Sequence, residues 1–313
     1  SSYGSHFEYF GEPQSPLSGL HSYDQRRRRL DQSRVDFKGI EYIDEGEIGP
    51  VVEPDGTQNT IMFNDLHHGY GSLCSKLMPK VGDRPVNLAV FAGDIIDHAR
   101  SKFDFDQFLS GALAYVGRQL KCACRYVRGN HELMGAYGSH LRDAVAPAGD
   151  HPFYAAATLG GLRAVFLDSG ADGPDGAWTN MDLFDFNRFF KEETAWLDRE
   201  TSGEEWKKAK KRVAYIHIPP VYGRDKTRFC GDARRVGMYR ILRDRGLDLM
   251  MAGHTHNPLF AKPYEGLTSY PTAIGGAPNP RNATVTRCVY SNGSLTVDQF
   301  KTDGTVNFKE TIN

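Results

Sequence analysis

The sequence lacks any long apolar run. Its longest uninterrupted apolar stretches span only a few residues, whereas a membrane-spanning helix requires about 20. A signal-type apolar region is also missing after Ser1, so we expect a processed or trimmed product whose targeting segment is not part of this chain. The sequence therefore predicts no membrane span and constrains the compartment only weakly.

An excess of charge is missing as well. The chain has 38 Lys and Arg against 39 Asp and Glu, a formal net charge of -1. This balance creates no overall attraction to nucleic acid or to an anionic membrane, so a polyanion would have to be held by a local site. Basic residues cluster only at 26–29 and 207–212, and the first cluster is more typical of solvated charge than of a phosphate contact. A nucleic-acid partner is open but not favoured.

Cysteines are few and do not form a recognisable pattern. The five cysteines fit neither an even-numbered disulfide framework nor a zinc ribbon. Cys122 and Cys124 would point to the same face of a strand, which indicates small buried hydrophobic residues rather than ligands. The cysteine pattern supports no prediction about disulfides.

Composition divides the chain near residue 55. Residues 1 to 33 are rich in Ser, Gly, Pro and Gln and have few regularly spaced apolar positions, which indicates an arm. Residues 35–52 predict one or two strands, closed by a turn at Glu53-Pro54-Asp55-Gly56. We therefore expect an arm and the β remnant of a preceding module over 1–55, and an α/β domain over 56–313.

From residue 56 the chain alternates between apolar strands, polar loops and helices, as α/β proteins do. Predicted strands 60–63, 87–92, 123–127, 213–216 and 247–252 end directly in Asp65 and His67, Asp94, Asn130 and His131, His217, and His254 and His256. Because the carboxyl ends of strands in open α/β sheets face a common crevice, we expect these side chains to meet. The tail, 284–308, predicts strands joined by turns at Asn292-Gly293 and Asp303-Gly304.

The chemistry of this set indicates metal binding. It combines carboxylates, imidazoles and an amide without thiolate, which suits Mn, Fe, Zn or Ni in a working site rather than a closed structural zinc site. The two-residue spacing of Asp65/His67 and of His254/His256 would send each pair to one side of extended backbone. Two ions that share one carboxylate would use all seven candidate ligands, which are Asp65, His67, Asp94, Asn130, His217, His254 and His256.

These five motifs, in this order, resemble the calcineurin-like metallophosphoesterase superfamily. The motifs are Asp65-Leu66-His67, Gly93-Asp94-Ile95-Ile96-Asp97, Gly129-Asn130-His131-Glu132, His217 and Gly253-His254-Thr255-His256. The resemblance implies an α/β fold, a four-layer α/β/β/α sandwich of two mixed β-sheets flanked by helices. It also implies that residues 56–313 are the catalytic domain, with two divalent or mixed-valence metal ions that serve the hydrolysis of phosphate esters.

The resemblance further implies the role of each residue. One ion would be held by Asp65, His67 and His256, the other by Asn130, His217 and His254, with Asp94 as the bridge. His131 would be the catalytic histidine outside the ligand shell, oriented by Asp97. Purple acid phosphatases have a tyrosine ligand where this chain has Asp97, so the resemblance is to the bacterial proteins similar to them that lack it. Such proteins are often exported, so a periplasmic or secreted location is slightly favoured over a cytoplasmic one.

Several neighbouring residues have two interpretations. Arg128 would bind a phosphoryl oxygen, to which the planar guanidinium is suited, or be solvated at a strand end; the resemblance favours the first. Glu132 is interpreted as a structural acceptor for nearby backbone. His68 should point to the face opposite the ligands, which indicates a role in supporting them or a place at the surface rather than metal binding. We expect the loops 170–187 and 222–231 to border the pocket, because long loops after strands often determine substrate choice.

We expect a phosphomonoesterase that acts on a phosphorylated small molecule or a phosphoprotein. A hydroxide bridging the two ions would attack phosphorus in line, and His131 would protonate the leaving oxygen. A phosphodiesterase or nuclease would use the same centre. A non-catalytic interaction module usually lacks ligands that are all present here, and a metal-dependent binding scaffold is the third alternative. The motifs do not indicate the oligomeric state.

Overall fold

The computed structural model of the protein describes residues 56–141, 153–173, 175, 185–222, 228–229 and 233–313, together with the short strand β1 (Gly46–Glu47). The predicted arm, its arginine run at 26–29 and most of the predicted strands over 35–52 lie outside the described residues. Among the helices that are described, none combines the length and the apolar character needed to cross a membrane. The expected division of the chain at residue 55 stays a prediction.

The first sheet has six strands in the order β15-β14-β13-β2-β3-β4. They are β2 (Gln58–Phe63), β3 (Leu88–Ala92), β4 (Ala123–Val127), β13 (Thr284–Ser291), β14 (Ser294–Lys301) and β15 (Val306–Ile312). β2, β3 and β4 run parallel, and β13 to β15 form an antiparallel meander beside β2. The predicted turn at Asn292-Gly293 joins β13 to β14, with the positive φ values, 49° and 81°, that a tight hairpin requires.

The second sheet has seven strands in the order β1-β5-β6-β7-β10-β12-β11. They include β5 (Ala155–Leu159), β6 (Leu162–Phe166), β7 (Lys211–Tyr215), β10 (Leu249–Ala252), β11 (Leu259–Ala261) and β12 (Thr272–Ile274), and a separate pair is formed by β8 (Val221–Tyr222) and β9 (Arg228–Phe229). β6, β7, β10 and β12 run parallel, whereas β5 is antiparallel to β6 and β11 is antiparallel to β12; β1 pairs with β5 in parallel. Both sheets are therefore mixed, as the resemblance implied.

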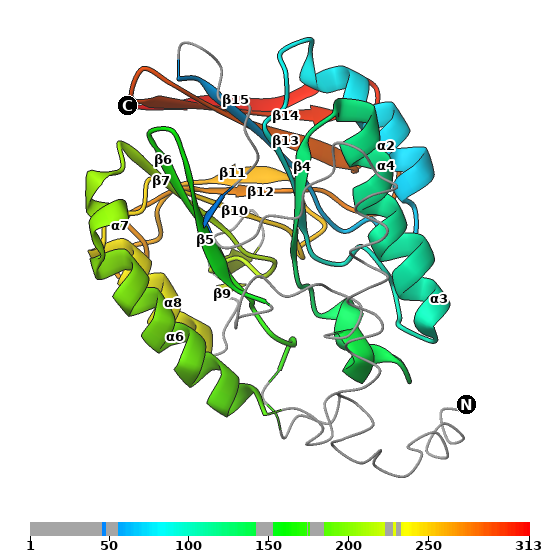
Figure 1. The fold of residues 1–313 in the computed structure, drawn as a ribbon, viewed down its shortest axis with the longest axis horizontal. Coiled ribbons are helices and arrows are strands. Elements are labelled where there is room, and N and C mark those ends of the chain that lie inside the picture. The colour runs from blue at the N-terminus through cyan, green and yellow to red at the C-terminus, as the bar shows by residue number, and fades with distance from the viewer. Residues whose placement is uncertain are drawn as a thin grey trace.

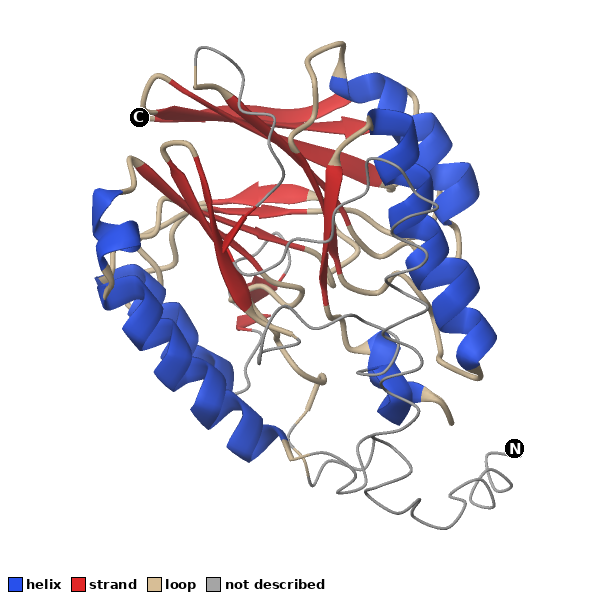
Figure 2. Ribbon diagram, in the orientation of Figure 1, coloured by secondary structure: helices blue, strands red, loops and turns tan. Residues whose placement is uncertain are grey.

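Helices cover the outer face of each sheet (Figures 1 and 2). Over the first sheet lie α2 (Tyr70–Leu77), a 3₁₀ turn (Met78–Val81), α3 (Lys102–Asp104), a π-helical segment (Phe105–Ser110) and α4 (Gly111–Leu120). Over the second lie α6 (Phe186–Ser202), α7 (Glu204–Lys208) and α8 (Ala233–Asp244). The four layers are helix, sheet, sheet and helix, which confirms the predicted sandwich.

Strand alternation builds the cores between these layers. In β2, Ile61 and Phe63 pack toward α2 and α4, while Met62 packs into the apolar layer between the sheets. In β10, Met251 joins that same inner layer, and Met250 packs toward α6 and α8. Such strands are buried on both faces, which explains why they are continuous apolar runs in the sequence. Polar side chains follow directly on the ends of these strands and are buried as well, as Asn64 and Asp65 are after β2.

Candidate metal centre

The predicted ligands gather where strands of both sheets end. The first sheet supplies the residues after β2, β3 and β4, and the second supplies those after β7 and β10. Among the described residues, two of the groups able to hold a metal ion consist of Asp65, His67 and His256, and of Asp94, His217 and His254. In each group the ligand atoms lie within 4.8 Å of one another. We call these groups the first and the second position.

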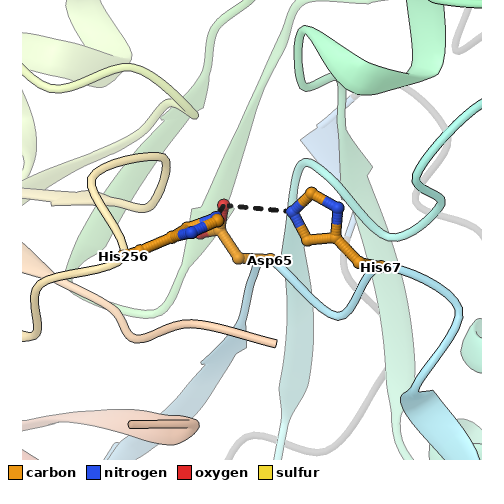
Figure 3. A group of neighbouring side chains, drawn as sticks. All are labelled: Asp65, His67 and His256. Atoms are coloured by element: carbon orange, nitrogen blue, oxygen red, sulfur yellow. Dashed lines mark hydrogen bonds and ion pairs between the residues drawn. The ribbon is translucent and has the colours of Figure 1, made fainter. Parts of the chain in front are cut away.

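The first position is organised around the fully buried Asp65 carboxylate. Its Oδ1 lies 3.1 Å from His256 Nε2 and 4.0 Å from His67 Nε2, so that it stands between the two rings (Figure 3). None of the described residues forms a hydrogen bond with the buried His67 Nε2, which is 3.8 Å from Asp94 Oδ2. A buried imidazole nitrogen that faces two carboxylates and has no proton partner fits a divalent cation.

The second position is formed by closely spaced donors. His217 Nε2 lies 3.1 Å from Asp94 Oδ2 and 3.0 Å from Asn130 Oδ1, and this amide oxygen is 3.1 Å from His254 Nδ1. His217 Nδ1 donates to the carbonyl oxygen of Ala92 at 2.8 Å, which directs Nε2 toward the position. Asp94 Oδ2 faces both His67 and His217, so its carboxylate lies between the two positions.

The charges of the second position fit a cation as well. Burial would raise the pKa of Asp94, but the neighbouring His217 and His131 hold it far below the usual carboxyl range. Burial would lower the pKa of His217, but Asp94 raises it to about 10, while burial and the nearby His217 lower the pKa of His254 to about 3. These shifts favour an ionised Asp94 carboxylate and a neutral His254 imidazole. A metal ion would replace the proton that His217 shares with Asp94.

The backbone at the ligands departs from the expected geometry. The paired ligands were predicted on extended backbone, but φ is positive at Asp65 (50°), His67 (41°), His254 (70°) and His256 (53°), and at Asp94 (53°). The prediction of extended backbone is therefore wrong. Asp65 and His67 still face one position, whereas His256 faces the first position and His254 the second. Left-handed backbone is costly for residues other than glycine and is found where the surrounding structure holds a functional site in place.

Two glycines allow the strand ends to approach this closely. A Cβ at Gly93, whose φ is +80°, would overlap the His217 ring, and a Cβ at Gly129 would overlap the Asp94 side chain. Below them the buried Glu132 carboxylate accepts hydrogen bonds from the backbone N–H groups of Asp94 (3.0 Å), Ile95 (2.6 Å) and Gly129 (2.9 Å). Glu132 is the structural acceptor that the sequence predicted.

His131 lies beside the positions as expected, but Asp97 holds it in a different way. His131 Nδ1 donates to the carbonyl oxygen of Asp97 at 2.8 Å and is 3.4 Å from its carboxylate, and Nε2 is 3.9 Å from Asp94 Oδ2. The Asp97 carboxylate is closer to His67 Nδ1 (3.1 Å) and His98 Nδ1 (2.8 Å). The backbone of Asp97, more than its side chain, therefore orients His131.

Arg128 forms an ion pair with a buried carboxylate of the other sheet. Its guanidinium is 2.5 Å from the fully buried Asp168 and 4.0 Å from the ring centroid of Phe153, and the residue is 7% exposed. The backbone N–H of Asp168 in turn donates to the carboxylate of the buried Glu193 at 2.8 Å. The ion pair with Asp168 lets Arg128 tie the end of β4 to the end of β6, and its contact with a phosphoryl oxygen stays a prediction.

Three residues near the ligands were missed or left open. Asn64 Nδ2 donates to Asp65 Oδ2 (2.5 Å), and Asp172 Oδ2 accepts from Asn130 Nδ2 (3.0 Å). His68 Nε2 accepts from the backbone N–H of Asp97 (3.3 Å), as a residue behind the ligands would. Asp172 belongs to the predicted loop 170–187, so this loop borders the site at Asp172; residues 174, 176–184, 223–227 and 230–232 lie outside the described residues. The Gly-rich and Asp-rich sequence around Asp172 contains no pattern that distinguishes this residue from the rest of the loop.

The fold is shared with solved structures of low sequence identity. A purple acid phosphatase from yellow lupin is 13% identical with a TM-score of 0.63, and the match covers 84% of this chain and 55% of that one. A dimetal phosphatase from Danio rerio is 14% identical with a TM-score of 0.57 (82% and 98% covered), and GAP50, the anchor in the inner membrane complex of Plasmodium, is 12% identical with a TM-score of 0.55 (82% and 89%). The chain thus spans about half the length of the lupin enzyme.

Sequence comparison identifies the family directly. Among curated proteins no sequence matches significantly. The family profile described as calcineurin-like phosphoesterase, however, matches residues 59–258, which is more than half of the chain and includes every predicted ligand. Together with the two mixed sheets and the paired ligand groups, this match establishes that the chain belongs to the calcineurin-like phosphoesterase family.

Proposed function

We propose that the protein is a dinuclear-metal phosphoesterase whose substrates are phosphate monoesters. The observation that carries the proposal is the position of the Asp94 carboxylate, which faces His67 of the first position and His217 of the second. One carboxylate that faces both ligand groups is what a pair of ions requires, since each ion shares its charge. The identity of the ions, Mn, Fe or Zn, belongs to the proposal as well.

Each of the two ions would be held by its own set of residues. Asp65, His67 and His256 would hold one ion, and Asn130, His217 and His254 the other. When bound, the ions would supply Lewis-acid stabilisation of charge on the phosphoryl group and a lowered pKa for water. The left-handed backbone at the ligands fixes their directions, so that substrate binding does not have to order them.

His131 would act on the leaving oxygen. Its Nδ1 proton is engaged with the Asp97 carbonyl, which leaves Nε2 directed toward the Asp94 side of the site. An imidazole that is partly exposed and outside both ligand groups of the proposed centre is suited to donate a proton to a departing alkoxide.

The described basic cluster does not favour a nucleic-acid substrate. Lys211 and Arg212 stand at the start of β7, whereas His217 follows the end of that strand, so the cluster and the ligands lie at opposite ends of it. Lys211 Nζ is moreover paired with Asp248 at 3.0 Å. A phosphorylated small molecule or a phosphoprotein therefore remains the proposed substrate, and a periplasmic or secreted location remains part of the proposal.

The test combines metal analysis with a substrate panel. We expect two equivalents of metal per chain in the purified protein and hydrolysis of aryl and alkyl phosphate monoesters in preference to bis-aryl diesters. Preferred cleavage of diesters would replace the monoesterase by a phosphodiesterase. Two bound ions without turnover of any ester would instead indicate a scaffold, a role consistent with the fold shared with GAP50.

A further inference from the structure

Asp172 contacts two predicted ligands of the second position at once. It lies in the segment after β6, and its Oδ2 accepts a hydrogen bond from Asn130 Nδ2 at 3.0 Å. Its Oδ1 lies 3.4 Å from His254 Nε2. Both contacts are made to atoms on the outer side of the ligands, because Asn130 Oδ1 and His254 Nδ1 face each other at 3.1 Å on the inner side.

The contact to Asn130 decides which end of the amide faces the position. A carboxamide can be turned by half a rotation, which exchanges an acceptor oxygen for a donor NH₂ group. Only the oxygen can bind a cation. The Asp172 carboxylate is an acceptor alone, so it holds the NH₂ group outward and directs Oδ1 toward His217 Nε2, 3.0 Å away.

The contact to His254 acts on its tautomer. Among the described acceptors, Asn130 Oδ1 lies 3.1 Å from Nδ1 and Asp172 Oδ1 lies 3.4 Å from Nε2. A cation held by Asn130 Oδ1 would leave Nδ1 unprotonated, and the proton on Nε2 would then face Asp172. Carboxylates that receive the outer N–H of a ligand histidine fix its orientation and raise its basicity.

We propose that Asp172 is a positioning residue that presets Asn130 and His254 for the second metal position. The proposal rests on the dinuclear centre proposed above. Asp172 itself is outside the ligand groups, and its side chain is 46% exposed, so it acts through the two ligands. Asp97 holds the corresponding place at the first position, where its carboxylate is 3.1 Å from His67 Nδ1.

The test is a Mn²⁺ titration of Asp172→Ala followed by electron paramagnetic resonance. Two neighbouring Mn²⁺ ions couple, whereas a single ion gives an isolated signal, so occupancy of the second position is read without an activity assay. We expect affinity for one of the two ions to fall about 10–100-fold, the usual effect of removing an outer partner, with the other unchanged. Asp172→Asn should lose less, because its side-chain oxygen still accepts one hydrogen bond.

Controls separate positioning from simple loss of charge. The exposed Asp83→Asn removes the same charge before the start of β3, at the end opposite Asp94, and should bind both ions as the wild type does. A purely electrostatic effect of Asp172 would shrink with added salt, whereas loss of preset ligands would persist. Adding His256→Ala to Asp172→Ala should remove the remaining ion, which identifies it as the one at the first position.

The outcomes are distinguishable. Unchanged binding of both ions by Asp172→Ala, equal weakening of both, or an effect abolished by salt would each overturn the positioning role. Failure of the wild-type protein to bind two Mn²⁺ ions would instead overturn the dinuclear centre on which the proposal rests.

Discussion

The two metal positions share one carboxylate but differ in how deeply they are buried. At the second position, Asp94, Asn130 and His217 are all buried. At the first, Asp65 is fully buried, but the His256 side chain is 43% exposed. The second position is closed by buried residues that follow β3, β4 and β7, whereas the first is open to solvent on the His256 side. We therefore expect the two ions to differ in exchange rate and affinity, with the first released sooner.

The largest effect is expected for Asp94→Asn, because this carboxylate faces both positions. We expect both ions to be lost, and activity to fall by more than the roughly 100-fold that loss of an outer partner costs. Metal analysis and monoester hydrolysis measure the two effects. An Asp94→Asn protein that keeps one ion with full affinity would show that the carboxylate is not shared.

His131→Ala keeps every predicted ligand of both positions and removes the residue that is proposed to protonate the leaving oxygen. We expect about 10²–10⁴-fold slower hydrolysis of an alkyl phosphate, the range for a general acid, and a much smaller loss for a nitrophenyl phosphate. Rates on both esters, measured with metal content, check this. Equal losses on both would assign His131 to phosphoryl positioning, and loss of metal would make it a ligand.

Arg128→Ala tests the support behind the second position. Removal of the guanidinium leaves Asp168 buried and unpaired next to Glu193; burial already raises the pKa of Asp168 despite the arginine. Breaking such a buried pair costs about 3–5 kcal/mol of unfolding free energy, measured by denaturant titration. A variant with wild-type stability but a raised KM would instead support the predicted contact between Arg128 and a phosphoryl oxygen of the substrate.

His256→Ala should separate the positions. The exposed His256 serves only the first, so we expect loss of one ion while the buried second position keeps the other. Partial chelation of the wild type should give the same single-ion species before complete removal. Simultaneous release of both ions at every chelator concentration would contradict the predicted difference in exposure.

Asp97→Asn should have the smallest effect. Its carbonyl oxygen, which holds His131 Nδ1, is unchanged by the substitution, whereas the contact to His67 Nδ1 is weakened. We expect roughly tenfold weaker binding of the first ion, the lower end of the range for outer partners, and an unchanged preference between alkyl and nitrophenyl esters. A loss confined to the alkyl ester would show that the carboxylate, rather than the carbonyl, orients His131.

The sequence by itself determined the family, the layered fold and which residue types surround the candidate centre. Strands buried on both faces are continuous apolar runs, and the polar residues at their ends, such as Asp94 and His217, are therefore visible as local patterns. The hairpin at Asn292-Gly293 was predicted for the same reason, since its turn chemistry is contained in adjacent residues.

Only the tertiary structure decided which side chains support the ligands. The sequence predicted a phosphate contact for Arg128, whereas the structure pairs its guanidinium with Asp168, which follows a strand of the other sheet. Asp172 is 42 residues from Asn130 and lies in a loop without periodicity, so nothing local identified it. The left-handed backbone at the ligands was hidden in the same way, because residues such as His254 adopt it only where tertiary contacts outweigh its local cost.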